Sequence, residues 1–128
     1  MGSFEKFEDM QVWQKSRELT KKIYILSNQG LFRRDFSLRD QIRKACISIM
    51  SNIAEGNERK TDKSFANFLS IAKGSASEVR SQLYIALDQG YINKTDFGDA
   101  LILTNEIGKM LNSLINYLQT GKKLSLRS

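Results

Sequence analysis

Apolar residues recur at spacings of three and four along most of the chain, which is the period of an amphipathic helix. Short polar or glycine-containing stretches divide this pattern into four segments. The predicted helices cover about residues 9–29, 38–55, 62–89 and 96–120. Because the connections are short, neighbouring helices are forced to run antiparallel. The pattern therefore predicts an all-α protein, an antiparallel up-down-up-down four-helix bundle in one domain (residues 1–121), followed by a basic tail (residues 122–128).

Capping residues predict where these helices begin and end. Ser37 and Asp40 resemble a capping box at the start of the second helix, and Thr61 or Asp62 can cap the third. Thr95 is the expected cap of the fourth helix. Glycines are expected to end the four helices in turn, namely Gly30, Gly56, Gly90 and Gly121.

Three of the predicted helices carry a second apolar stripe beside the stripe that faces the core. A surface helix of a monomer needs only one such stripe, so the second stripes indicate a subunit interface. The alternative is that a compact bundle simply has wide apolar stripes. The candidate interface residues are Ile47, Met50, Ala54, Ile71 and Ile85.

A row of polar side chains, which we name the polar seam, interrupts the apolar second helix. Its members are Gln41, Ser48, Asn52 and Glu55. Each is expected at the edge of the core, where an unpaired polar group would cost about 1–3 kcal/mol. They should therefore bond to one another, to backbone at the next corner, or to a neighbouring subunit. We favour this structural role over contact with a ligand.

Four segments of the chain stand in an order and at a spacing that characterise a known family. They read FEDMQVWQKSREL (7–19), LRDQIRKACISIMSNIAEG (38–56), FANFLSIAKGSASEV (65–79) and GYI (90–92). With these segments the chain resembles the four-helix bundle protein family, whose members are also called 23S rRNA intervening-sequence proteins. The resemblance implies a homopentameric ring of bundles. It also implies kinship with accessory proteins of diversity-generating retroelements, which bind a reverse transcriptase and nucleic acid.

Half of the net charge of +6 lies around the second predicted helix, and the basic tail (residues 122–128) carries another +3. Eight basic residues between positions 33 and 63 face five acidic ones, whereas residues 64–93 are neutral and residues 94–121 carry −1. Repeated around an oligomer, such a region would attract a phosphate backbone. The alternative is a solvated surface that only aids solubility. The candidate nucleic-acid contacts are Arg33, Arg34, Arg39, Arg43, Lys44, Arg59, Lys60 and Lys63.

The composition argues against most kinds of enzyme and of metal site. The chain has no histidine and one cysteine, so it cannot build a Ser-His or Cys-His nucleophile pair or a credible zinc site. We expect no catalytic residue, no metal and no cofactor. A lone cysteine and the lack of a secretory signal or an apolar run of about 20 residues favour a cytoplasmic protein without membrane contact.

Three functions remain after these exclusions. The leading hypothesis is a non-enzymatic oligomeric binding protein that contacts RNA or DNA through backbone phosphates and can act as an adaptor for another protein, such as a reverse transcriptase. The alternative is a structural or protein-interaction scaffold with no nucleic-acid role. An enzyme that uses carboxylates alone would need Glu55 or Glu78 in a cleft with a perturbed pKa, and it ranks last.

Overall fold

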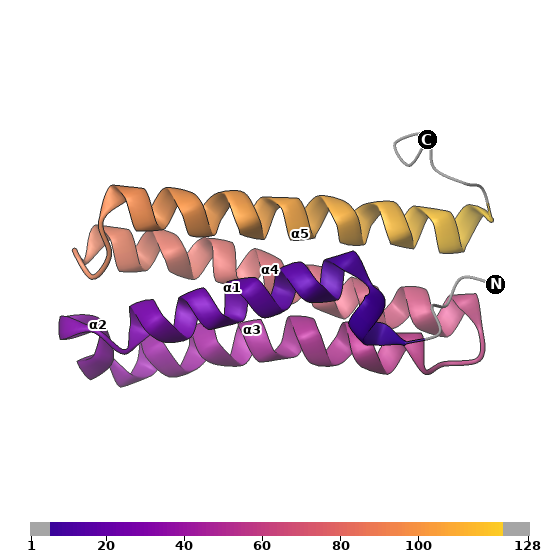
Figure 1. Ribbon diagram of the computed structural model, residues 1–128, viewed down its shortest axis with the longest axis horizontal. Coiled ribbons are helices and arrows are strands. Elements are labelled where there is room, and N and C mark those ends of the chain that lie inside the picture. The colour runs from indigo at the N-terminus through magenta and orange to yellow at the C-terminus, as the bar shows by residue number, and fades with distance from the viewer. Residues whose placement is uncertain (1–5, 122–128) are drawn as a thin grey trace.

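The computed structural model describes residues 6–121, and within that range all regular secondary structure is helical (Figure 1). The long helices are α1 (Gln11–Ser27), α3 (Phe36–Asn57), α4 (Asp62–Asp88) and α5 (Lys94–Thr120). A short helix, α2 (Gly30–Arg34), lies between α1 and α3, and a 3-10 turn (Phe7–Asp9) precedes α1. The predicted all-α class is confirmed. The predicted basic tail, residues 122–128, lies outside the described residues.

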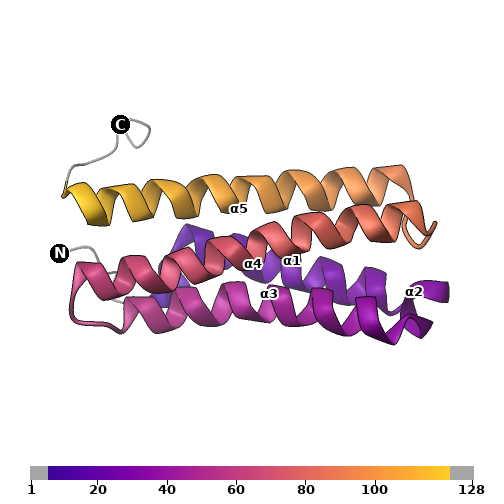
Figure 2. The same ribbon diagram turned by 180° about the vertical axis from the view of Figure 1, so that it is seen from behind.

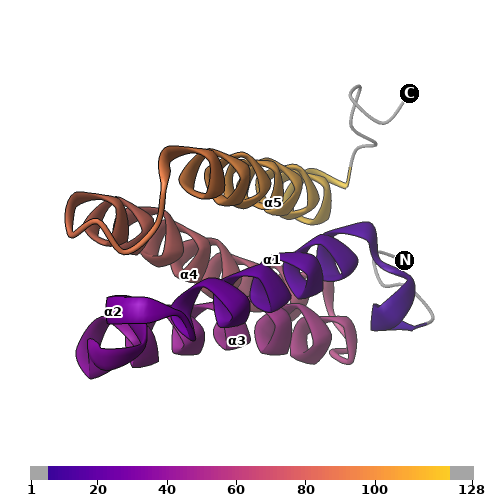
Figure 3. The same ribbon diagram turned by 60° about the vertical axis from the view of Figure 1, so that its left-hand side comes forward.

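The four long helices lie side by side, and successive ones run in opposite directions (Figure 1). α3 and α4 form one closely packed pair and α4 and α5 another, while α1 packs against α3 and α5. The view from behind and the turned view show the same arrangement, with α2 at one end of the molecule, beside the start of α3 (Figures 2 and 3). Every long helix therefore has two long neighbours and can bury one wide apolar face.

The core lies between these faces and is mainly apolar, with a few buried polar residues such as Ser16, Ser75 and Thr104. The apolar residues that recur at helical spacing in the second predicted helix are buried in α3, namely Leu38, Ile42, Ala45, Ile49 and Ile53. Burying one leucine or isoleucine side chain stabilises the fold by about 1.5–3 kcal/mol. Cys46 lies in the same core with no exposed surface, and burial raises the pKa of its thiol to about 12.

Two of the predicted helix caps are wrong, each by two residues. α3 begins at Phe36 because Asp35 Oδ1 accepts a hydrogen bond from the Leu38 backbone N–H (3.0 Å), so Ser37 lies inside the helix. α5 begins at Lys94 because Asn93 Oδ1 accepts from the Asp96 N–H (2.7 Å), which replaces Thr95 as the cap. In both cases an Asx side chain upstream satisfies the free N–H groups first. Thr61 caps α4 as predicted, accepting from the Ser64 N–H at 3.1 Å.

The four glycines that were predicted to end helices have different roles in the structure. Gly90 and Gly121 follow α4 and α5 with φ of 73° and 68°, in the left-handed conformation predicted for them. Gly30 does not end α1: it starts α2 with φ of 52°. Gly56 stays inside α3, where a Cβ atom would lie 2.9 Å from the Phe65 ring and from Phe68 Cβ. This glycine is therefore required for the approach of α4, and not for ending α3.

Candidate nucleic-acid interface

The corner between α2 and α3 is held in place by Tyr91, which lies in the turn between α4 and α5. Asp35, besides capping α3, accepts a hydrogen bond from the Tyr91 hydroxyl on its other oxygen (2.9 Å). The Tyr91 ring stacks on buried Phe32 of α2, with centroids 5.4 Å apart. The bond to Asp35 is the main cause that raises the pKa of Tyr91, and desolvation and the carboxylate charge add to it. The α4–α5 turn thus fixes the position of α2.

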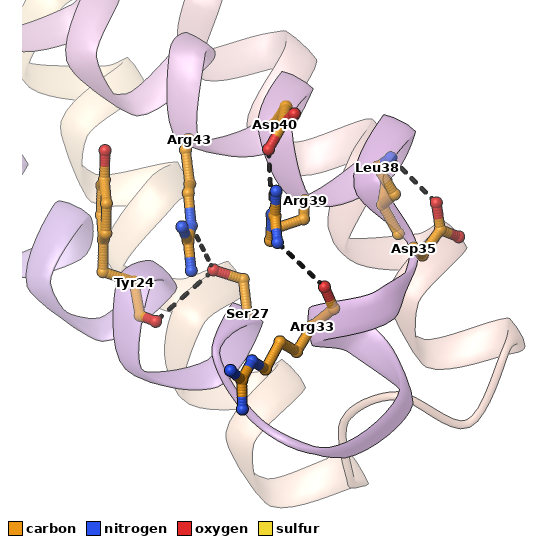
Figure 4. Close-up of polar contacts among 8 residues, drawn as sticks. All are labelled: Tyr24, Ser27, Arg33, Asp35, Leu38, Arg39, Asp40 and Arg43. Atoms are coloured by element: carbon orange, nitrogen blue, oxygen red, sulfur yellow. Dashed lines mark hydrogen bonds and ion pairs between the residues drawn. The ribbon is translucent and has the colours of Figure 1, made fainter.

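Three arginines gather at this corner around an open groove of about 580 Å³. We name this site the basic corner; it is lined by Gly30, Arg33, Arg34, Phe36 and Arg39. Arg39 is fixed: its Nε donates to Asp40 Oδ1 (2.9 Å) and its Nη1 donates to the Arg33 carbonyl (3.0 Å), as Figure 4 shows. Its guanidinium also lies 4.8 Å from the centroid of the Phe36 ring.

The other two guanidinium groups of the basic corner are unpaired. Arg33 and Arg34 are exposed, and within residues 6–121 neither side chain has a hydrogen-bond or ion-pair partner. The Phe36 ring beside them is 64% exposed. Two free guanidinium groups, one fixed guanidinium and one open aromatic face can together hold a phosphate and a neighbouring base.

Two further predicted contacts on α3 do not line this groove. Arg43 is half-buried between α1 and α3: its Nε donates to Ser27 Oγ (2.8 Å) and its guanidinium stacks over the Tyr24 ring at 4.5 Å (Figure 4). Both of its partners, Ser27 and Tyr24, belong to α1, so Arg43 joins α3 to α1. Lys44 is exposed on α3 outside the groove.

The remaining predicted contacts lie at the opposite end of α3. Arg59 follows Arg39 by twenty residues, and a helical rise of 1.5 Å per residue puts about 30 Å between them. Arg59 is paired with Glu55 (2.6 Å) and stacks over the Phe68 ring (4.6 Å). Lys60 and Lys63 are exposed nearby. The structure therefore divides the predicted basic region into two separate clusters.

The polar seam is hydrogen-bonded within the protomer. Ser48 Oγ accepts from Ser75 Oγ of α4 (2.7 Å) and from Asn52 Nδ2 (3.1 Å), and the same Asn52 group donates to the Ser48 carbonyl (2.8 Å). Gln41 and Glu55 are exposed; Gln41 donates to Ser37 Oγ (3.3 Å) and Glu55 pairs with Arg59. The bond between Ser48 and Ser75 joins α3 to α4, and the other bonds of the polar seam stay within α3 or join it to Arg59 just beyond its end.

The predicted interface residues differ in exposure. Ile47, Ile71 and Ile85 are exposed by 46%, 53% and 45%, which is high for isoleucine. Ala54 is half-buried, and Met50 is half-buried against α1, where its sulfur accepts from Thr20 Oγ1 at 3.3 Å.

A third set of cations was missed by the analysis of the sequence. Lys73 and Arg80 of α4 and Lys109 of α5 line a groove of about 470 Å³ between the two helices. Both helices are in segments of near-zero net charge, so counting charge along the chain gave no signal. The spacing of Lys73 and Arg80, seven residues apart on one helix face, could have indicated it.

Two kinds of site are absent from the described part of the chain. Residues 6–121 contain no group of three or more cysteine or acidic side chains placed to hold a metal ion. No helix among them is long and apolar enough to cross a membrane.

Comparison with known proteins gives a family and a structural relative. A family described as 23S rRNA-intervening sequence protein matches residues 8–113. The chain is also similar to a crystal structure from Bacteroides thetaiotaomicron VPI-5482, described as a protein with unknown function from the S23 ribosomal protein family. The two are 28% identical with a TM-score of 0.75, over 81% of this chain and 97% of that chain. Among curated proteins no sequence matches.

Proposed function

Because the chain belongs to the 23S rRNA-intervening sequence protein family, we propose that it is a non-enzymatic oligomeric protein that binds RNA or DNA through backbone phosphates. Such a protein can also act as an adaptor for a second protein, for example a reverse transcriptase. The proposal needs cations that are free to meet phosphate on a surface that does not rearrange.

The observation that carries the proposal is the basic corner. Arg33 and Arg34 have no partner in the described residues, so no protein carboxylate has to be displaced when phosphate binds. Arg39 and the backbone beneath it are already fixed by hydrogen bonds, which lowers the ordering cost of binding. The exposed Phe36 ring adds a face on which a base can stack.

The oligomer in this proposal is a ring of up-down-up-down four-helix bundles, with the pentamer as the expected form. Its support is the exposed apolar surface on two different helices, with Ile47 on α3 and Ile71 and Ile85 on α4. Two different surfaces that meet head to tail generate a closed ring when the rotation between subunits closes. A ring also repeats the basic corner around its axis and so raises the local positive potential.

A salt titration tests nucleic-acid binding. We would measure the anisotropy of fluorescent RNA and DNA, each as a single strand and as a duplex, between about 50 and 300 mM salt. The Arg33→Gln/Arg34→Gln variant should weaken binding to all sequences about equally and reduce the slope of log K against log salt by about 1.8 on duplex DNA. The matched control is Arg17→Gln/Lys21→Gln, which removes the same charge from α1.

Two results would contradict this part of the proposal. Micromolar wild-type protein that binds no RNA or DNA at about 50 mM salt would leave the scaffold alternative. Equal effects of the two double variants would show that the net charge, and not the basic corner, drives binding.

Light scattering tests the assembly. The wild type should have a multiple of the protomer mass at micromolar concentration, and Ile71→Glu/Ile85→Glu should give monomers of unchanged helicity because both side chains are already exposed in the protomer. A wild-type monomer mass would contradict the oligomer.

A further inference from the structure

The groove between α4 and α5 lies midway along both helices and has no role in the proposal above. Beside its three cations it is lined by short polar side chains and small residues. These are Ala76, Ser77, Thr104, Asn105, Gly108 and Asn112. A Cβ added at Gly108 would meet nothing within 4 Å, so the groove is open at this point.

The charge of this groove is entirely positive. None of its lining residues is acidic. The acidic neighbour on α5, Glu106, pairs with Lys15 of α1 at 3.4 Å and is therefore directed to the other side of α5. Lys73 and Arg80 are two helical turns apart, about 10 Å along α4. Lys109 faces them from α5.

The cations of the groove are not neutralised by carboxylates, and Lys73 is held in place by a neutral partner. Lys73 Nζ donates to Asn112 Oδ1 across the groove (3.0 Å), a bond to a neutral amide that leaves the full charge of the ammonium. No ion pair in residues 6–121 involves Lys73, Arg80 or Lys109. Ser77 and Asn105 add neutral hydrogen-bonding groups between the charges. This combination suits a ligand with several spaced negative charges and polar atoms between them.

An aromatic ring extends the same face of α4. Tyr84 lies one turn beyond Arg80 and is 45% exposed. The Phe97 ring meets it edge to face, with centroids 4.9 Å apart, and so holds it in place. An exposed ring at the end of a basic groove offers a stacking face to an unpaired base, and paired bases inside a duplex cannot use it.

We propose that the α4–α5 groove binds a single strand of nucleic acid, with its phosphates on Lys73, Arg80 and Lys109 and a base stacked on Tyr84. The inference rests on the proposed function and adds to it a second site and a preference for unpaired nucleic acid. Each protomer then holds nucleic acid at two places, the basic corner and the groove.

The test compares an unstructured fluorescent RNA of about 20 nucleotides with a duplex of the same length. In Lys73→Gln/Arg80→Gln/Lys109→Gln, the salt slope on the single strand should fall by about 2, because each lost phosphate contact removes about 0.7. Affinity for the duplex should change less than twofold. The control Arg17→Gln/Lys21→Gln/Lys94→Gln removes three exposed cations outside both sites.

Tyr84→Leu gives a readout that charge alone cannot move. It should weaken binding of the single strand by about tenfold or more and leave the salt slope unchanged. Circular dichroism checks that each variant keeps its helicity.

The outcomes separate the two proposals. If the wild type binds and the groove variant behaves like its control, the groove inference is overturned and the basic corner stands. If the groove variant weakens duplex and single strand equally, the assignment to unpaired nucleic acid is overturned. If the wild type binds no nucleic acid at all, both proposals are overturned.

Discussion

The two ends of α3 carry the same kinds of residue and use them differently. At the α2 end a carboxylate, Asp35, is occupied by a helix N-terminus and by Tyr91, and the nearby Arg33 and Arg34 stay unpaired. At the α4 end Glu55 is paired with Arg59, and the corner is closed by apolar contact. Asp35 thus leaves both neighbouring arginines unpaired at the α2 end, whereas Glu55 at the α4 end pairs with its neighbouring arginine, Arg59. Among the described residues the free charges at the α4 end are those of Lys60 and Lys63, which have no ion pair. The number of charges in a segment does not measure how many can bind a ligand.

The largest expected effect is the loss of stability on substitution of Gly56, at the α4 end of α3. Gly56→Ala should lower the free energy of unfolding by about 3 kcal/mol, because the new Cβ would lie 2.9 Å from Phe68 Cβ, which cannot rotate away. Gly74→Ala on exposed α4 surface is the matched control. Its Cβ meets nothing within 4 Å, so it should gain up to about 1 kcal/mol. Urea unfolding of both variants measures this; the same sign in both would contradict close packing at Gly56.

Removal of Asp35, which anchors the α2 end through polar contacts, should cause the next largest loss of stability. Asp35→Ala should destabilise the protein by about 2 kcal/mol, about half from the lost cap and half from the lost bond to Tyr91. It should also weaken nucleic-acid binding at the basic corner, although Asp35 carries the wrong charge to contact phosphate. Stronger binding in this variant would show that its negative charge matters more than its positioning of α2. Asp35→Asn keeps an oxygen acceptor and should cost less.

The hydrogen bond between Tyr91 and Asp35 should be lost at high pH. The folded-state pKa of Tyr91 is raised above 10, so its bond to Asp35 contributes in full below pH 10 and is lost as pH rises through the raised value. Unfolding measured in urea from pH 8 to 11 should show a steeper decline for the wild type than for Tyr91→Phe. Cys46, whose pKa is about 12, adds the same decline above pH 9 to both proteins and cancels in the difference. Parallel curves would contradict the bond.

The smallest effect belongs to the ion pair at the other end. Glu55→Gln should change the free energy of unfolding by less than about 0.5 kcal/mol, since both partners of the pair are largely exposed. It should, however, free Arg59 and make the α3–α4 end more attractive to phosphate. A measurable rise in nucleic-acid affinity without a change in stability would support the comparison. A stability loss near that of Asp35→Ala would contradict it.

The helices could be predicted from the sequence because their burial follows a local rule. Residues spaced three and four apart share a face, so the stripe from Leu38 to Ile53 identified the buried side of α3 without knowledge of its neighbours. The start of α3 could not be predicted in this way. Asp35 and Ser37 are both good caps, and the choice of Asp35 is supported by Tyr91, which is 56 residues away.

The candidate sites were harder to predict because they, too, depend on contacts between residues that are distant in sequence. Arg39 and Arg59 belong to one basic segment of the sequence, but the unbroken length of α3 separates them by about 30 Å. The α4–α5 groove combines Lys73 and Arg80 with Lys109, and no sum over consecutive residues brings these three together. Which cations share a surface depends on which helices pack, and that information lies in contacts distant in sequence.

The bond between Tyr91 and Asp35 also has a consequence for the order of folding. It closes a chain segment of 56 residues, whereas α3 and α4 are joined by a short connection and can pair at small entropic cost. We therefore expect the α3–α4 hairpin to form first and the basic corner to be completed only when the turn after α4 docks beside α2. On a ribosome, the nascent chain would be unable to present the completed basic corner until the turn after α4, which carries Tyr91, has emerged.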